Sequence, residues 1–297
     1  MNTVIILIVS MAACLFADVA KKLYTDRSVG SMTSLHSYNA WGCIVSAIVL
    51  LLWGGIESLS LLTVLLGILF GLLISLQSLT VMKALQIGPM SYTMVIVNCS
   101  TVISAVSGVL FFHESIGLWQ IVGIVLMLFS FAFAVEKKAD EKKASLKWLI
   151  FSILAFFMTG GIGIMQKVHQ NLPCRAEINA FLVFAFIASF LISAALMLVY
   201  RAREGQPIFE RTAQGRVNWF LVSVMLVSGV LVAANHKLNL YLSGIMDSAV
   251  FFPIVNGGGL VLITLTAVVA FREKLTLKQW IGVGFGVLSV LFLCLPT

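Results

Sequence analysis

The sequence predicts an all-α membrane protein with ten transmembrane helices in two inverted five-helix repeats. Three observations lead to this fold class. Hydrophobic residues make up 60% of the 297 residues and charged residues only 10%, far below the roughly one quarter charged of globular proteins. Apolar segments long enough to cross a hydrocarbon core of about 30 Å recur from end to end. A motif of the first half also occurs in the second half, which indicates an internal duplication.

Ten apolar spans are expected, in the order 3–22, 35–53, 61–84, 90–112, 117–135, 146–166, 178–200, 217–238, 248–271 and 277–295. The first span lacks the preceding Lys or Arg of a signal peptide, so it is expected to be permanent. A charged connection at 136–147 separates two sets of five spans, which places the expected domains at 1–143 and 144–297. An odd number of spans gives the second set the opposite polarity, as in the inverted repeats of secondary transporters.

The repeated motif consists of an apolar span with one Asn near its start, a short acidic turn and a Gly-rich span. Its members are Asn98, Glu114 and Gly123 in the first half and Asn256, Glu273 and Gly282 in the second. The Glu-to-Gly spacing is identical in the two copies, and the Asn-to-Glu spacing differs by one residue. This agreement over three positions is what a tandem duplication predicts.

Further sequence pieces accompany the motif in each half. They are Ala84-Leu85, Gly88-Pro89-Met90-Ser91, His113-Glu114-Ser115-Ile116 and Gln120 in the first half, and Pro253, Arg272-Glu273-Lys274-Leu275 and Gln279 in the second. With ten spans and an internal repeat, they resemble the EamA-type permeases of the drug/metabolite transporter superfamily over nearly the whole chain. The resemblance implies a multi-pass transporter of the cytoplasmic membrane. It specifies the fold strongly and the substrate hardly at all, because the family exports amino acids, metabolites, nucleotide derivatives and drugs.

The distribution of basic residues predicts an orientation. Of the 19 Lys and Arg residues, 15 lie in or beside connections that follow odd-numbered spans. The positive-inside rule then makes these connections cytoplasmic and places both termini outside. The family resemblance implies cytoplasmic termini instead, so two orientations stay open.

Several classes of function are not expected. The sequence has no HExxH, GxGD or P-loop motif, and its four His and five Cys show no metal-ligand spacing or CxxC pair. We therefore expect no enzyme, cofactor or metal. The net charge of +7 resides mainly in short loops, so lipid and a small solute are the expected partners and nucleic acid is not. The oligomeric state is left open, and a monomer is compatible with the sequence.

Polar and small residues inside two spans are candidates for lining a solute cavity. They are Asn98 and Thr101 in the fourth span and Phe252, Asn256 and Gly259 in the ninth. An amide inside a bilayer needs a polar partner, which is either a water-filled cavity or another helix. These two alternatives have equal weight for the two Asn residues. Pro253 and the run 257–259 of glycines predict a locally irregular helix at the second site.

Basic and aromatic side chains near span ends form a second set of cavity candidates. They are Tyr38, Trp41, Lys83, Lys167 and His236. Snorkelling to lipid headgroups and an interfacial aromatic belt explain such residues without a function. Alternatively, a basic member attracts the carboxylate or phosphate of a solute, and Lys167 is the first choice because it ends a Gly-rich span.

Acidic residues and glycines have separate expected roles. Glu114 and Glu273 are interpreted as hairpin residues whose carboxylates favour the positive end of the following helix, and the alternative is a role as proton carriers. Asp18 lies well inside a span, where it either pairs with Lys21 and Lys22 or couples transport to protons. Gly123, Gly282 and Gly286 are expected, with Pro253, to serve helix packing, since small residues let membrane helices approach closely.

The leading functional prediction is an alternating-access secondary transporter that exports a small polar metabolite or an amino-acid-like solute. A proton-coupled multidrug exporter is the first alternative, and it would depend on Asp18. A non-transporting membrane scaffold is the second alternative. It has less support because the sequence leaves no sizeable soluble interaction domain outside the spans.

Overall fold

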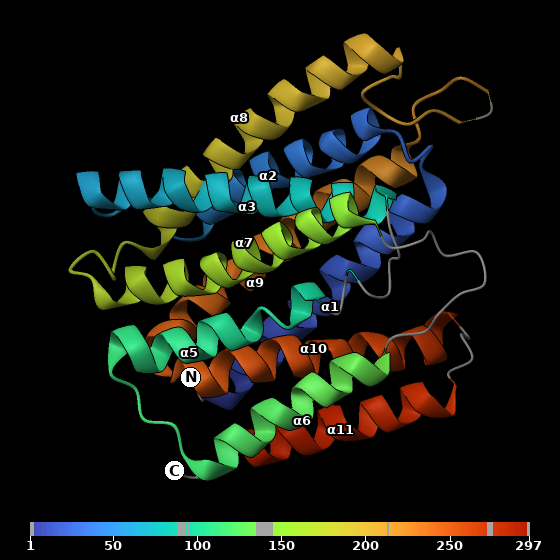
Figure 1. The fold of residues 1–297 in the computed structure, drawn as a ribbon. Helices are drawn as coiled ribbons and strands as arrows, with labels where there is room; N and C mark the ends of the chain where they lie inside the picture. Colours follow the sequence, from blue (N-terminus) through green and yellow to red (C-terminus); the bar gives the residue numbers. More distant parts are fainter. Residues whose placement is uncertain are drawn as a thin grey trace. The chain divides into compact units, whose positions relative to one another are not determined.

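The computed structural model describes residues 3–87, 93, 96–134, 145–212, 214–271 and 276–295, and these residues are almost entirely helical (Figure 1). The helices are α1 (Thr3–Arg27), α2 (Met32–Gly54), α3 (Leu61–Ile87), α5 (Thr101–Phe112), α6 (Leu118–Ala134), α7 (Leu146–Asn171), α8 (Ile178–Glu204), α9 (Trp219–Ile245), α10 (Ser248–Phe271) and α11 (Leu277–Leu293). In the described part of the chain, the sole β-type pairing is an isolated bridge between Arg211 and Val217.

The helices follow the expected apolar spans closely. Within the described residues, six of them (α1, α2, α3, α7, α8 and α9) contain segments long and apolar enough to cross a membrane. The helices α5, α6 and α11 are apolar but shorter. The all-helical membrane class is thereby confirmed, whereas the count of ten spans stays a prediction.

The fourth expected span, 90–112, differs from the prediction because the helix is interrupted. A turn at Cys99 and Ser100 precedes α5, so Asn98 lies before the turn. There the N–H groups of Val102 and Ile103 donate to carbonyls three residues back, at 3.0 and 2.9 Å, which is the tighter 3₁₀ pattern. Short polar side chains such as Asn and Ser compete for backbone hydrogen bonds and so weaken a helix locally.

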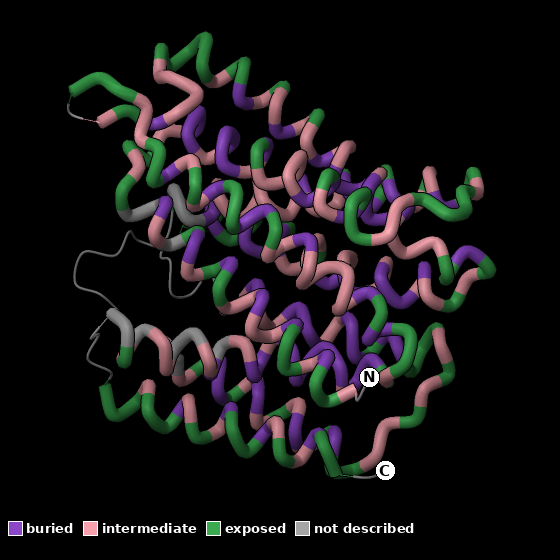
Figure 2. Tube along the Cα trace, turned by 180° about the vertical axis from the view of Figure 1, so that it is seen from behind, coloured by how far each residue is buried: buried purple, intermediate pink, exposed green. Residues whose placement is uncertain are grey.

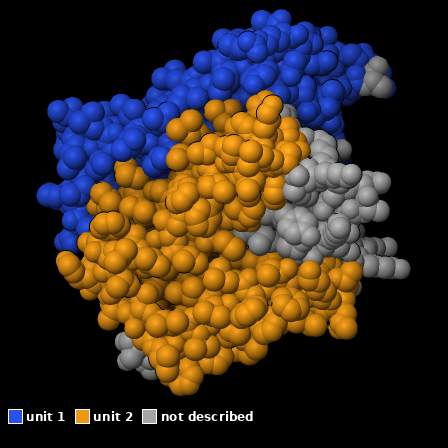
Figure 3. All heavy atoms as spheres, viewed as in Figure 1, with its two compact units in different colours: residues 1–75, 169–241 blue, residues 76–168, 242–297 orange. Residues whose placement is uncertain are grey.

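The chain forms two compact units (Figure 3), and each combines segments from both halves of the sequence. Unit 1 consists of residues 1–75 and 169–241, and unit 2 of residues 76–168 and 242–297. Compact packing therefore joins the two sequence halves within each unit. The expected repeat boundaries, 1–143 and 144–297, stay a prediction about the ancestry of the sequence.

In unit 1, α2 packs against α8, its expected counterpart in the second half. Near the start of α2, the Thr33 hydroxyl donates to Glu204 at 2.7 Å, at the end of α8. In the middle, the Cys43 thiol lies 3.4 Å from the Ser189 hydroxyl. At the end of α2, Gly54 faces Asn179 near the start of α8, where a Cβ atom would collide with the Asn179 amide. From the start to the end of α2, the contacted residues run from the end of α8 back to its start. The two helices are therefore antiparallel.

In unit 2, α6 packs against α11, which is also its expected counterpart. The Ser130 hydroxyl donates to the carbonyl of Gly282, and the Ser289 hydroxyl donates to the carbonyl of Gly123, both at 2.7 Å. Each Ser lies seven residues after the Gly of its own helix, which is about 10.5 Å along the axis. The two crossed bonds therefore require antiparallel helices.

The third pair of counterparts, α5 and α10, packs together in unit 2 as well. The Asn256 amide nitrogen donates to the Thr101 hydroxyl at 2.7 Å. A Cβ atom at Gly108 would lie 2.7 Å from the Cβ of Ser248. Because the order of contacts again reverses between the helices, this pair is antiparallel too.

Burial separates packed from outward-facing sides of the helices (Figure 2). Phe70, Phe181 and Phe186 are fully buried in unit 1, and Met127 and Phe131 in unit 2. Large apolar side chains are nevertheless exposed along many helices, with Leu52 83% exposed and Leu277 78% exposed. Soluble proteins rarely expose apolar surface on this scale, so these side chains face lipid.

The predicted irregularity in the ninth span is not present, because α10 runs as one helix through Pro253. Pro253 is the sixth residue of α10, so it removes the single bond that an N–H there would make to the carbonyl four residues back, and the helix continues on both sides of it. The following glycines serve packing instead. A Cβ atom at Gly257 would lie 2.6 Å from the sulfur of Met127 on α6.

Candidate solute site

Glu114 is positioned by the end of α5. His113 ends this helix in the left-handed conformation, with φ of 55°, and is the only non-glycine residue with positive φ among the described residues. The N–H of Glu114 then donates to the carbonyl of Gly108 at 3.1 Å. A Cβ atom at Gly108 would collide with the Glu114 carboxylate. The turn and the missing side chain together aim Glu114 back toward α10.

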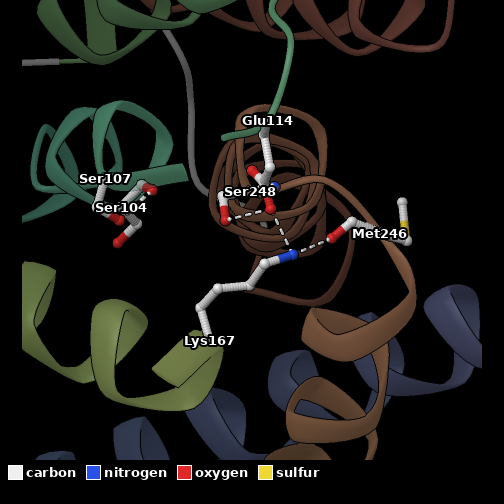
Figure 4. Close-up of polar contacts among 6 residues, drawn as sticks. All are labelled: Ser104, Ser107, Glu114, Lys167, Met246 and Ser248. Atoms are coloured by element: carbon white, nitrogen blue, oxygen red, sulfur yellow. Dashed lines mark hydrogen bonds and ion pairs between the residues drawn. The ribbon is translucent and has the colours of Figure 1, made fainter. Parts of the chain in front are cut away.

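The Glu114 carboxylate forms a buried ion pair with Lys167 (Figure 4). The distance from Lys167 Nζ to Glu114 Oε1 is 2.5 Å, and the two side chains are 9% and 7% exposed, respectively. Lys167 also donates to the carbonyl of Met246 at 2.8 Å. The ammonium group is thus held by one negative charge and by a carbonyl that follows the end of α9.

The same carboxylate caps the N-terminus of α10. The backbone N–H of Ser248 donates to Glu114 Oε2 at 2.7 Å, and the Ser248 hydroxyl lies 3.3 Å from Oε1. The first N–H groups of a helix have no partner within the helix, and the helix dipole favours an anion at this end. Both carboxylate oxygens are therefore hydrogen-bonded.

Lys167 reaches this position because α7 packs closely on α5 and α10. A Cβ atom at Gly160 would lie 2.8 Å from Ile103. At Gly163 a Cβ atom would contact Ser104 and lie 3.1 Å from the ring of Phe252. Residues four apart share one helix face, so Lys167 lies one turn beyond Gly163 on the face that meets the other two helices.

This geometry corrects the expected role of Glu114. The sequence suggested that its carboxylate favours the start of the following helix, α6. The structure instead shows the carboxylate at the start of α10, in the other half of the sequence. The reason is the left-handed turn at His113, which reverses the chain direction before α6 begins.

The candidates on the fourth and ninth spans also meet in unit 2. Asn256 has a hydrogen-bond partner on another helix, namely Thr101, which is 1% exposed. Phe252 is buried and packs on Phe251, with ring centroids 4.9 Å apart. Gly259 differs from Gly257, because a Cβ atom there would meet no described atom within 4 Å. These contacts place Thr101, Phe252 and Asn256 in the packed interior of unit 2.

Comparison with known proteins identifies the family. Residues 3–135 match the sequence model of the EamA-like transporter family. This match supports membership of the chain in the family. Members of this family are membrane transporters, and the long apolar helices of the described residues fit a multi-pass membrane protein. The resemblance seen in the sequence is thereby confirmed, with the match extending over residues 3–135.

Two further proteins are similar to this chain. An uncharacterized protein of Haemophilus influenzae is 27% identical over 188 residues, which cover 62% of this chain and 58% of that protein. A protein of known crystal structure superposes with a TM-score of 0.73 over 98% of this chain and 95% of its own, at 14% identity. At that identity, the likeness shows the fold alone.

The remaining candidates of the EamA-like transporter lie apart from Glu114 and Lys167 in sequence. The Tyr38 hydroxyl lies 2.5 Å from the Ser228 hydroxyl, and Trp41 is 38% exposed beside Phe209. The His236 ring contacts the edges of two Phe rings. Lys83 lies half-buried on α3. Of these four candidates, Lys83 belongs to unit 2, and Tyr38, Trp41 and His236 belong to unit 1.

Asp18 and the last members of the repeated motif complete the comparison with the sequence. Asp18 is exposed on α1, and its carboxylate lies 3.8 Å from the Cys14 sulfur. The side chain of Lys22 and the whole of Glu273 lie outside the described residues. Within the described part, no group of three or more His, Cys, Asp or Glu residues is arranged to hold a metal ion.

One polar cluster, between α1 and α9, was not predicted from the sequence. The Ser10 hydroxyl donates to Asn239 at 2.6 Å, and the Asn235 amide donates to the Ser10 carbonyl at 3.0 Å. The Asn239 amide in turn donates to Asn235 at 3.3 Å. Two Asn residues four apart in an apolar span are a detectable signal, because both amides then lie on one face and need partners.

One further carboxylate resembles Glu114 in its backbone contacts. Glu177, in the connection before α8, accepts bonds from the N–H and the hydroxyl of Ser60 at 3.0 and 2.9 Å, at the start of α3. Hydrogen bonding from Thr63 and then from the Ser60 N–H lowers the pKa of Glu177 below its ordinary value. Within the described residues Glu177 interacts electrostatically with His169 but forms no ion pair with a lysine, so the lysine distinguishes the Glu114 site.

Proposed function

We propose that this EamA-like transporter is a secondary transporter that works by alternating access, with ten spans in two inverted five-helix repeats. The crossed hydrogen bonds between α6 and α11 carry the proposal. They join equivalent residues of the two sequence halves across antiparallel helices. Opposite polarity of equivalent spans is the property that defines an inverted-topology repeat. The antiparallel pairs α2 with α8 and α5 with α10 give independent support.

The proposed cargo is a small polar metabolite or an amino-acid-like solute, exported across the cytoplasmic membrane. Ionisable residues within membrane segments are costly and mark substrate or ion pathways. The buried Glu114–Lys167 pair supports a polar or charged solute for this reason. Either the gradient of the solute itself or a proton gradient supplies the energy.

Counterflow in proteoliposomes tests the transport proposal. Purified protein is reconstituted into liposomes loaded with unlabelled solute, and uptake of the labelled solute is measured for a panel of amino acids, organic acids, sugars and cationic dyes. A secondary transporter accumulates at least one labelled solute above protein-free liposomes. A scaffold protein would show no counterflow with any member of the panel.

Cysteine labelling tests the inverted topology. Ser115 and Thr276 are exposed and lie just before α6 and α11, respectively. Each is replaced singly by Cys in a variant that lacks the five native cysteines, and a membrane-impermeant maleimide is applied to intact cells and to inverted vesicles. Opposite accessibility of the two positions supports the proposal. Labelling from the same side would refute it.

A further inference from the structure

We propose that Lys167 and Ser248 form a binding site for the carboxylate of the transported solute, and that the Glu114 carboxylate occupies this site when no solute is bound. The proposal rests on the proposed transport function and adds a solute class, organic anions that carry a carboxylate. It commits three residues to defined roles. Lys167 and Ser248 recognise the solute, and Glu114 competes with it.

The donor groups around Glu114 are those that a solute carboxylate needs. One oxygen meets the Lys167 ammonium, and the other accepts the Ser248 N–H at 2.7 Å. The Ser248 hydroxyl adds a contact of 3.3 Å to the first oxygen. Charge-assisted hydrogen bonds of this kind are stronger than neutral ones. All of these donors belong to α7 and α10 and none to Glu114 itself, so the set remains when Glu114 leaves.

The occupant is attached in a way that permits exchange. Glu114 belongs to the non-helical residues 113–117 rather than to a helix. Its carboxylate lies against the bare backbone of Gly108, so no side chain of that residue blocks its path. Lys167 keeps a second bond to the carbonyl of Met246 at 2.8 Å. The lysine is therefore held in place independently of the carboxylate that it binds.

Electrostatics selects the solute class. A buried ammonium without a negative partner is strongly disfavoured. An incoming carboxylate replaces the Glu114 charge at Lys167, so the buried ammonium keeps a negative partner throughout the exchange. A neutral or cationic solute brings no negative charge to Lys167 in exchange for that of Glu114. Exchange of one carboxylate for another is thus the low-energy route to opening this site.

Chemical rescue of stability tests the site directly. Glu114→Ala removes the carboxylate and leaves space, and we expect its melting temperature to fall. Acetate or formate, compared with chloride at constant ionic strength, should raise the melting temperature of this variant in a saturable manner. The rescue should be absent in the Glu114→Ala/Lys167→Met double variant. Rescue of the double variant to the same extent, or no rescue of the single variant, would overturn the proposal.

Glu177→Ala provides the matched control. Glu177 caps a helix through the N–H and hydroxyl of a serine, as Glu114 does, but has no lysine partner in the described residues. Acetate should therefore raise the melting temperature of Glu177→Ala much less than that of Glu114→Ala. Equal rescue of both variants would show a general effect at helix ends and would contradict a specific carboxylate site.

A transport measurement keeps the proposal testable if Glu114→Ala does not fold. Glu114→Gln retains the shape of the side chain and removes its charge, so the internal competitor is lost. We expect a lower KM for carboxylate solutes in counterflow and a larger thermal stabilisation by them than in the unmodified protein. A purely structural carboxylate predicts the opposite change in both. That result would refute the competitor role.

The solute class is tested with matched pairs of carboxylates and their uncharged amides. Reconstituted protein should exchange carboxylates and not the amides, and Lys167→Met should reduce this exchange to the level of protein-free liposomes, with partial retention in Lys167→Arg. Counterflow of neutral or cationic solutes only, unaffected by Lys167→Met, would overturn the carboxylate site and leave the transport function intact. No counterflow of any solute would instead refute the transport function.

Discussion

Asn256 donates a hydrogen bond from its side-chain amide to the hydroxyl of Thr101 at 2.7 Å, and so joins the ninth span to the fourth. The second copy of the repeated Asn is thus bonded to a residue three positions after the first copy. An unpaired amide at membrane depth is unfavourable, and this bond satisfies one of its donors. The contact therefore couples the two sequence halves inside unit 2.

Asn256→Leu should destabilise the protein modestly, since hydrogen bonds between membrane helices average about 0.6 kcal/mol and reach about 1.7 kcal/mol. A double-mutant cycle with Thr101→Val, followed by denaturant unfolding in detergent, measures the coupling. We expect a coupling energy within that range. Strict additivity of the two single effects would show that the bond contributes nothing to stability.

Gly286→Leu should be poorly tolerated, whereas Gly284→Leu should be accepted. A Cβ atom at Gly286 would lie 2.5 Å from Val261 and 2.9 Å from the hydroxyl of Ser130, and at Gly284 it would meet no described atom within 4 Å. Overpacking a tight helix contact costs about 1–3 kcal/mol or more. Melting temperature and expression of the two variants provide the measurement, with Gly284→Leu as the control for added bulk in the same helix.

The effects of single substitutions at the Glu114–Lys167 pair on stability should not add up to the effect of the double substitution. Removing one partner of a buried ion pair leaves an uncompensated charge and costs about 3–5 kcal/mol. Lys167→Met alone should therefore be strongly destabilising, and the Glu114→Met/Lys167→Met double variant less so. Equilibrium unfolding checks this order. A double variant less stable than either single one would contradict the ion-pair account.

Acidification should remove the contribution of Glu177 to stability. Its pKa in the folded protein lies below the ordinary value of 4.5, so the contribution is complete above that value and is lost as the pH falls through the folded pKa. The melting temperatures of the unmodified protein and of Glu177→Gln should thus converge on going from pH 6 to pH 3. Parallel curves over this range would show that Glu177 is not the group that titrates.

The sequence predicted the bounds of most helices because their signal is local. A long apolar segment with few charged residues becomes a helix in lipid whatever its neighbours are, since every backbone group must be satisfied within the segment. The same argument fails at residues 96–100, where the balance between helix and turn depends on short polar side chains. It also overestimated the effect of Pro253, because α10 continues as one helix on both sides of this residue.

The candidate site was only partly predictable. Lys167 was singled out as a potential partner for an anion, and Glu114 was noted for its place in the repeat, but nothing in their spacing connects the two. Their contact depends on the left-handed turn at His113 and on the close approach at Gly108 and Gly163. Each is a property of backbone path rather than of composition.

By itself, the amino-acid sequence determined that the chain lives in a membrane, that its two halves carry the same motif and that most helices begin and end where they do. Hydrophobic segments and the repeated motif can be read from the sequence alone. Each apolar segment forms a helix in the bilayer because its length spans the hydrocarbon core and its backbone groups must be satisfied within the segment. Only the tertiary structure decided which polar group meets which. The crossed Ser130 and Ser289 bonds and the Glu114–Lys167 pair join residues far apart in sequence, and such contacts depend on how helices pack, because each buried polar group must find its partner on a neighbouring segment.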